Sequence, residues 1–259
     1  MADDEPQASS HVQSVERALD LLEALAASPT EQGVSALGAK VELPYATIHR
    51  LLTTLVSRGY VRRVSSSRKY LLGPQLVPLG DAANKVFRGW TTPYLKQLAE
   101  MSGETANLAL LDDTYAVYLA QVPSRHQLRM FTEVGNRVLP HSTAIGKVLL
   151  AYSDEAEIER VIRTNGLPAY TENTITDRAG FFAALKTARE EGYAIDEQEQ
   201  EFGVVCIAVP IVSGERPVAA VSISGPAGRL GPEQRERIIP NMQAIAKDLE
   251  NEWYAQQAA

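Results

Sequence analysis

The chain has 259 residues, a formal net charge of −7 at pH 7 and a hydrophobic fraction of 45%. This composition is that of a globular protein with one large or two medium domains. No apolar run approaches the roughly 20 residues that span a bilayer, so no membrane segment is expected. The polar, acidic stretch 1–10 is no signal peptide and is predicted to be a disordered tail. The single cysteine, Cys206, excludes an internal disulfide framework and suits a cytoplasmic protein.

Residues 11–73 are predicted to form a winged helix-turn-helix domain. A helix over about 14–27 precedes a short second helix, a tight turn closed by Leu43-Pro44, and a longer helix over about 44–58. Ile48, Leu52 and Leu55 repeat at helical spacing and form one apolar stripe on the longer helix. Gly59 ends that helix. Two short strands, 60–64 and 69–72, then make the wing.

The side of the longer helix opposite this stripe carries side chains that can donate hydrogen bonds to phosphates and base edges. Residues 40–69 hold seven basic side chains and one acidic, a net +6, whereas residues 74–259 carry a net −7. Charge alone also fits a solvated surface on an ordinary small domain. Because the basic segment coincides with the helix-turn-helix pattern, it predicts DNA binding. The predicted contact residues are Tyr45, Thr47, His49, Arg50, Arg62, Arg63 and Arg68. Tyr45 fits a phosphate contact and a simple cover over the helix start equally well.

The remainder of the chain is predicted to be a linker helix, within 74–89, and a larger domain over 90–254. Helices are expected over 75–87, 92–101, 144–152, 154–164, 176–191 and 232–253. Strands are expected over 105–111, 116–122, 128–133, 193–195, 205–211 and 218–224. Helices and strands do not alternate strictly. The pattern therefore favours an α+β fold with a mixed, mostly antiparallel sheet flanked by helices over a doubly wound fold.

Seven segments carry a resemblance to a known family. They are LPYATIHRLL (43–52), YLLGP (70–74), GETANL (103–108), HSTAIGK (141–147), GYAID (192–196), CIAVP (206–210) and AVSISGP (220–226). In this order and spacing, the chain resembles the IclR family of bacterial transcriptional regulators over nearly its whole length. The resemblance implies an N-terminal winged helix and a C-terminal GAF-like domain that binds a small effector. It also implies a homodimer or a dimer of dimers, and the second half looks closest to the branch that senses glyoxylate and related small acids.

The resemblance further implies an effector pocket against the sheet, under the loop before the first large helix. Ser222 and Ser224 lie two apart on a strand, so both hydroxyls face one side. The main-chain N–H groups where the helix at Gly146 begins can receive a carboxylate. Ile145 is bulkier than the small residue of the glyoxylate branch, which argues for another short carboxylate or keto acid. The implied lining is Ala144, Ile145, Gly146, Asp196, Val204, Cys206, Ser222 and Ser224.

These residues also fit other roles. Cys206 fits a buried core cysteine as well as a ligand contact. A Cys206–His141–Asp196 hydrolase is conceivable, but the spacing fixes no geometry and no nucleophile turn surrounds Cys206, so His141 is expected to orient a loop. Asp196 and Glu197 are interpreted as a solvated strand end. Four histidines and one cysteine show no metal-ligand spacing, so neither metal nor cofactor is expected.

The sequence thus predicts a ligand-responsive transcriptional regulator, a repressor as is commonest in this family, rather than an enzyme. It would bind a pseudo-palindromic double-stranded operator and sense a small organic acid of a catabolic pathway. Three alternatives stay open. They are an activator of the same family, an enzyme with an accessory DNA-binding domain, and a nucleoid-type binder without a ligand.

Overall fold

A computed structural model describes residues 12–130, 132–214 and 216–257, without the side chains of 83–88 and 254–257. The predicted tail, 1–10, lies outside the described residues. The chain divides into two compact units, Met1–Ala83 and Asn84–Ala259. None of the helices in the described part combines the length and the apolar character needed to cross a membrane.

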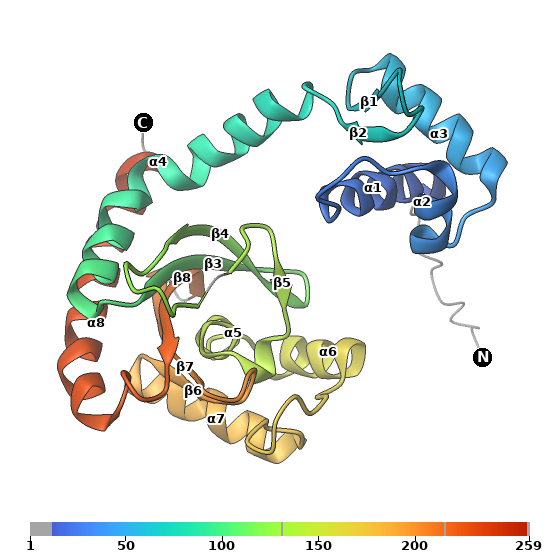
Figure 1. Ribbon diagram of the computed structural model, residues 1–259. Helices are drawn as coiled ribbons and strands as arrows, with labels where there is room; N and C mark the ends of the chain where they lie inside the picture. The colour runs from blue at the N-terminus through green and yellow to red at the C-terminus, as the bar shows by residue number, and fades with distance from the viewer. Residues whose placement is uncertain (1–11, 131, 215, 258–259) are drawn as a thin grey trace, which may run out of the picture. The chain divides into compact units, whose positions relative to one another are not determined.

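Between residues 12 and 75 the first unit folds as three helices and a two-stranded sheet in the predicted order (Figure 1). The elements are α1 (Gln13–Ala26), α2 (Val34–Val41), α3 (Tyr45–Ser57), β1 (Val61–Arg63) and β2 (Tyr70–Leu72). Leu21, Leu37, Ile48 and Leu52 are fully buried and form the centre of a small core. Pro44 is the extended residue just before α3, so the helix begins one residue later than predicted.

The wing is an antiparallel hairpin in which Arg62 pairs with Leu71. Gly59 follows the end of α3 and has φ +77°, a left-handed conformation that glycine adopts without strain. Gly73 closes the base of the wing. A Cβ there would lie 2.1 Å from the carbonyl oxygen of Gly59, so the two backbone segments approach this closely only because residue 73 has no side chain.

A single helix, α4 (Leu76–Ser102), replaces the two helices predicted over 75–87 and 92–101. Gly89 and Pro93 both lie inside this helix. Pro93 removes one backbone hydrogen bond. Leu95 and Leu98, which follow it, are buried against the sheet and the last helix, and this packing keeps the chain helical across the proline.

The second unit is built on one six-stranded sheet with the order β5-β4-β3-β8-β7-β6. Its strands are β3 (Thr105–Asp112), β4 (Tyr115–Val122), β5 (Arg137–Val138), β6 (Ala194–Glu197), β7 (Val204–Ser213) and β8 (Arg216–Pro226). The α+β fold and the mostly antiparallel sheet are confirmed. Every strand pair among the described residues is antiparallel. The prediction of a mixed sheet, with some parallel pairing, is therefore wrong for these residues.

The sequence predicts a strand over 128–133. The described residues of this segment, 128–130 and 132–133, form no strand, so the prediction is wrong for them. Side chains hold this segment instead of a backbone ladder. Thr105 Oγ1 donates to Met130 O at 2.7 Å, and Arg229 Nη2 donates to Leu128 O at 3.0 Å. The edge of β4 pairs with Arg137–Val138, a strand too short for its pattern to be seen in the sequence.

Helices cover both faces of this sheet (Figure 1). The second half of α4 and α8 (Pro232–Gln257) pack on one face. A 3₁₀ turn, η1 (Pro140–Ser142), and α5 (Ala144–Leu150) pack on the other, with α6 (Glu155–Asn165) and α7 (Arg178–Glu191) outside them. Every residue of α5 is buried. The first turn of α5 therefore lies on the sheet face that carries the polar side chains described next.

Candidate DNA-binding surface and effector site

The outer side of α3 presents four of the predicted DNA-binding side chains. Tyr45, His49 and Arg50 are exposed and Thr47 is half-buried. The rings of Tyr45 and His49 stack with centroids 6.4 Å apart. Thr47, His49 and Arg50 line a groove between α1 and α3 that Arg17 also enters from α1. Sequence reasoning missed Arg17, because a single arginine on an amphipathic helix carries no signal of its own.

The wing presents the other three predicted residues, Arg62, Arg63 and Arg68, and all three are exposed. Arg63 is partly engaged within the wing itself. Its Nε lies 3.4 Å from Arg68 O, and its guanidinium lies 5.8 Å from the centroid of the Tyr70 ring. Among the described residues, the guanidinium groups of Arg62 and Arg68 have no such contact and are accessible to a phosphate.

Polar residues of the second unit form two rows across the sheet. Asp196, Cys206, Ser224 and Thr105 are consecutive partners on β6, β7, β8 and β3. Two residues along each strand, in the second row, Ser222 on β8 is the partner of Asn107 on β3. Successive residues point to opposite faces, so residues two apart on each strand share the face that α5 covers. Val204, near the start of β7, shares that face with Cys206.

Asn107 joins the two predicted serines. Its Nδ2 lies 3.4 Å from Ser222 Oγ and 3.3 Å from Ser224 Oγ, while Gln121 Nε2 donates to Asn107 Oδ1 at 3.2 Å. Both serine hydroxyls thus face one side, as predicted. Because Asn107 donates to both serine oxygens, the two hydroxyl hydrogens can point toward a third group. Sequence reasoning missed Asn107, although an amide inside an otherwise apolar strand was a usable signal.

The first turn of α5 closes over this face. Ala144, Ile145 and Gly146 are buried. The Gly146 amide donates to Thr143 Oγ1 at 3.2 Å, so this one N–H of the helix start is engaged by the helix cap. Thr143 caps the helix and takes that donor.

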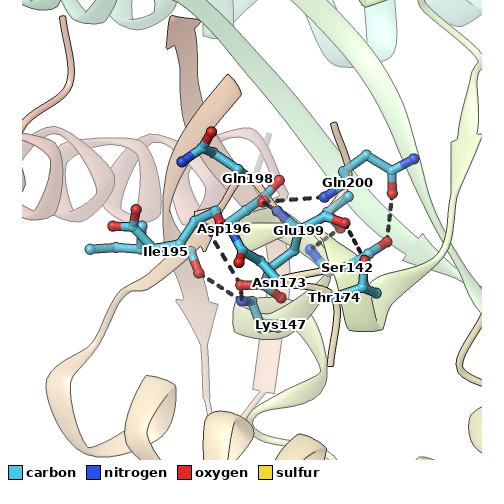
Figure 2. A network of polar contacts seen from close by, with 12 residues as sticks. Ser142, Lys147, Asn173, Thr174, Ile195, Asp196, Gln198, Glu199 and Gln200 are labelled. Atoms are coloured by element: carbon cyan, nitrogen blue, oxygen red, sulfur yellow. Dashed lines mark hydrogen bonds and ion pairs between the residues drawn. The ribbon is translucent and has the colours of Figure 1, made fainter. Parts of the chain in front are cut away.

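Asp196 lies in a buried network, not at a solvated strand end (Figure 2). Its side chain is 1% exposed, and Oδ1 accepts hydrogen bonds from Glu199 N at 2.6 Å and Gln200 N at 3.4 Å. Burial raises the pKa of the Asp196 carboxyl to about 6. Glu197, the next residue, is the exposed member of the predicted pair and contacts Arg235 on α8.

A buried ion pair lies beside Asp196. Lys147 Nζ, on α5, donates to Glu199 Oε1 at 2.5 Å and to Ile195 O at 2.6 Å (Figure 2). Lysine on a short helix is normally solvated, so sequence analysis had not singled out Lys147. The second carboxylate oxygen of Glu199 is buried and has no hydrogen-bond partner among the described residues.

Cys206 and His141 do not form a catalytic pair. Burial, with the nearby Asp196 carboxylate, raises the pKa of the Cys206 thiol, which therefore stays protonated and weakly nucleophilic. His141 Nε2 lies 2.9 Å from Pro168 O, so this ring orients a loop, as expected. No group of three His, Cys, Asp or Glu side chains in the described parts of the chain is placed to hold a metal ion.

Comparisons with known proteins match both units. The profile of the IclR helix-turn-helix domain matches residues 14–65, and that of the bacterial transcriptional regulator IclR C-terminal domain matches residues 85–251. The transcriptional regulator XynR of Escherichia coli K12 is 35% identical over 82% of this chain and 86% of its own length. The transcriptional repressor IclR of the same strain is 35% identical over 86% and 83%. The crystal structure of an IclR regulator from Alicyclobacillus acidocaldarius is 29% identical, with a TM-score of 0.82 over 93% and 98% of the two chains.

Proposed function

This chain belongs to the IclR family of bacterial transcriptional regulators, and we propose that a short carboxylate or keto acid controls its affinity for operator DNA. The protein is a DNA-binding regulator with an N-terminal helix-turn-helix and a C-terminal effector domain. It acts as a repressor in the cytoplasm. The acid binds against the sheet and shifts the regulator toward a conformation with lower DNA affinity. Only a difference in the acid's affinity for the two conformations can do this.

The DNA-binding surface consists of α3 and the wing. Arg50 and Thr47 face base edges, with His49 beside them, while Arg62, Arg63, Arg68 and Tyr45 meet the sugar-phosphate backbone. Arg50 on α3 and Arg62 on β1 are both exposed, so both guanidinium groups are accessible to DNA. In related folds such a helix enters the major groove, where a guanidinium can bind a guanine with two hydrogen bonds.

Replacing Arg50 by Ala should weaken operator binding by about 1–3 kcal/mol and relax its sequence preference, because a base contact is lost. Replacing Arg62 by Ala should weaken binding on all sequences alike and flatten the salt dependence by about one unit of slope. Titrations of labelled operator at several salt concentrations measure both effects. Arg237→Ala, an exposed arginine on α8, changes the net charge equally and is the control. If Arg50→Ala bound the operator with wild-type affinity, α3 would not be the recognition helix.

We propose that the operator is a pseudo-palindrome bound by a homodimer or a dimer of dimers. One winged helix buries little surface on DNA, and two-fold symmetry doubles it. The apolar side chains of Val12, just before α1, and of Val15 and Leu19 on α1 are exposed. Val77 and Leu79 are exposed at the start of α4. These stretches are suited to contacts between copies. Sedimentation of the protein–operator complex gives the number of chains.

The proposed effector site combines side chains from four strands with the first turn of α5. Ser222 and Ser224 offer two hydroxyl donors, Cys206 forms a small wall between them and Asp196, and Ala144, Ile145, Gly146 and Val204 enclose the space. The observation that carries the proposal is the pair of buried serines whose oxygens are both held by Asn107. Two aligned donors in an apolar enclosure are suited to one carboxylate.

The double replacement Ser222→Ala and Ser224→Ala should leave operator binding by the ligand-free protein nearly intact and abolish the effect of small acids on it. Calorimetry with a panel of short carboxylates and keto acids, and a mobility shift with operator, separate the two functions. Ser124→Ala removes another buried serine, whose hydroxyl donates to Gly103 O at 2.6 Å, and should keep the response. Unchanged acid binding in the double variant would place the effector elsewhere.

We also propose that the protein binds its effector without transforming it. The protonated thiol of Cys206 and the engagement of His141 with Pro168 O leave no activated nucleophile at this site. Turnover of a bound acid would contradict this.

A further inference from the structure

We propose that a small monocarboxylate enters this site together with one proton, which neutralises Asp196 while the anion binds at Ser222 and Ser224. This inference rests on the effector site proposed above. It assigns Asp196 a role in selecting the ligand. At neutral pH an anion binds only by drawing a proton from solution.

The geometry places Asp196 within reach of any ligand held by the serines. Asp196, Cys206 and Ser224 are direct partners on three adjacent strands, so only Cys206 separates the carboxyl from the hydroxyl. Neighbouring strands lie about 4.8 Å apart, so the outer two are roughly 10 Å apart. A two- or three-carbon acid with a hydrogen bond at each end fills that distance.

Asp196 is fixed in this position. Oδ1 accepts the backbone N–H groups of Glu199 and Gln200, which hold the carboxyl on the loop after β6. Oδ2 accepts neither of these N–H groups, so it is the oxygen that can take up a proton. The Cys206 thiol also hydrogen-bonds to this carboxyl, on the side where the ligand would lie. A carboxyl that is held at one oxygen cannot turn away from an incoming anion.

The charges around Asp196 leave its own charge uncompensated. Lys147 from α5 faces it, but Lys147 is paired with Glu199 at 2.5 Å, so these two sum to zero. The groups on the other packed elements are Cys206 on β7, Tyr118 on β4 and His141 on η1. Burial raises the pKa of the thiol and of the Tyr118 phenol and lowers the pKa of His141, so all three are neutral at pH 7. Arg235 on α8 pairs with Glu197, which points to the opposite face.

An entering anion thus meets one buried negative charge. Two carboxylates that share an enclosed site cannot both stay ionised, and the pair retains one proton between them. Burial already holds the pKa of Asp196 at about 6 in the ligand-free protein, so at pH 7 most molecules must take up that proton when the anion binds. The affinity for the anion should accordingly be greatest below pH 6 and fall as the pH rises above it.

Isothermal titration calorimetry with pyruvate tests this. Comparing phosphate and Tris buffers at pH 7 gives the number of protons bound per ligand, because the two buffers release protons with different enthalpies. We expect about 0.9 proton per pyruvate, and an affinity that falls about tenfold for each pH unit between 7 and 8. Asp196→Asn keeps the shape and removes the charge. It should take up no proton, bind pyruvate equally well across this range, and bind it at least tenfold more tightly than wild type at pH 8.

Glu197→Gln, one residue along on the opposite face, should keep the wild-type proton count and is the matched control. Binding of pyruvate by wild type with no proton uptake would overturn this inference and leave the effector site standing. No binding of pyruvate between pH 5 and 8 would overturn the small-acid site and this inference with it. The proton count in wild type needs no variant, so the test holds even if Asp196→Asn folds poorly.

Discussion

Replacing Lys147 by Met should lower the free energy of unfolding of the second unit at pH 7 by about 3–5 kcal/mol, because it leaves a buried carboxylate without its partner. The side chains of Lys147 and Glu199 are only 4% and 7% exposed. One oxygen of Glu199 already has no hydrogen-bond partner among the described residues, so loss of Lys147 removes the contact that most favours its ionised form. Urea titration followed by circular dichroism measures the change.

The pH dependence gives this prediction a sign. Burial already raises the pKa of Glu199, and the nearby Lys147 opposes that rise. Without the lysine the folded-state pKa rises further, so the penalty is largest at neutral pH and shrinks as acid protonates Glu199. The double variant Lys147→Met with Glu199→Gln should recover most of the loss. Lys186→Met breaks an exposed pair with Glu190 and should change little. A single variant as stable as this control would show that the buried pair contributes nothing.

The winged helix could be predicted because its signals are local. Ile48 and Leu52 repeat at helical spacing, Gly59 has the positive φ that ends a helix, and the wing strands flank a polar turn. Each of these depends on residues within a few positions of one another. Local structure of this kind can be predicted directly from the pattern of apolar and turn residues.

The parts that could not be predicted depend on partners distant in sequence. The segment 128–133 reads as a strand, but the edge of β4 pairs with 137–138. The sequence places Asp196 beside Glu197 in what looks like a solvated strand end, whereas in the structure Asp196 is buried on the face that α5 covers. The ion pair of Lys147 joins residues 52 apart in the chain. No local pattern distinguishes such residues from surface ones, because their burial is decided by tertiary packing.

The candidate effector site shows the same division. The spacing of Ser222 and Ser224 predicted that both hydroxyls face one side, since strand residues two apart always do. That Asn107 fixes both of them follows only from the pairing of β3 with β8. Likewise, the helix start at Gly146 was visible, but the use of its amide by Thr143 was not.

Replacing Gly146 by Ala should have the second large effect. A Cβ at this position would lie 2.3 Å from Pro140 Cα and 2.7 Å from Pro140 O. Both are backbone atoms and cannot rotate away, so α5 must move off η1. Overpacking of this kind costs about 1–3 kcal/mol, and a clash with backbone on one side places this variant at the upper end. Chemical denaturation of the second unit measures the cost.

The same displacement should reach the effector site, because Gly146 follows Ile145, which α5 holds buried against the sheet. We expect Gly146→Ala to bind operator like wild type, since the winged helix has its own core, and to lose its response to small acids. Gly89→Ala is the matched control. A Cβ there meets nothing within 4 Å and the position lies inside α4, so stability should hold or rise slightly through the stiffer unfolded chain. If Gly146→Ala matched this control in both stability and acid response, the contact between α5 and η1 would not position the effector site.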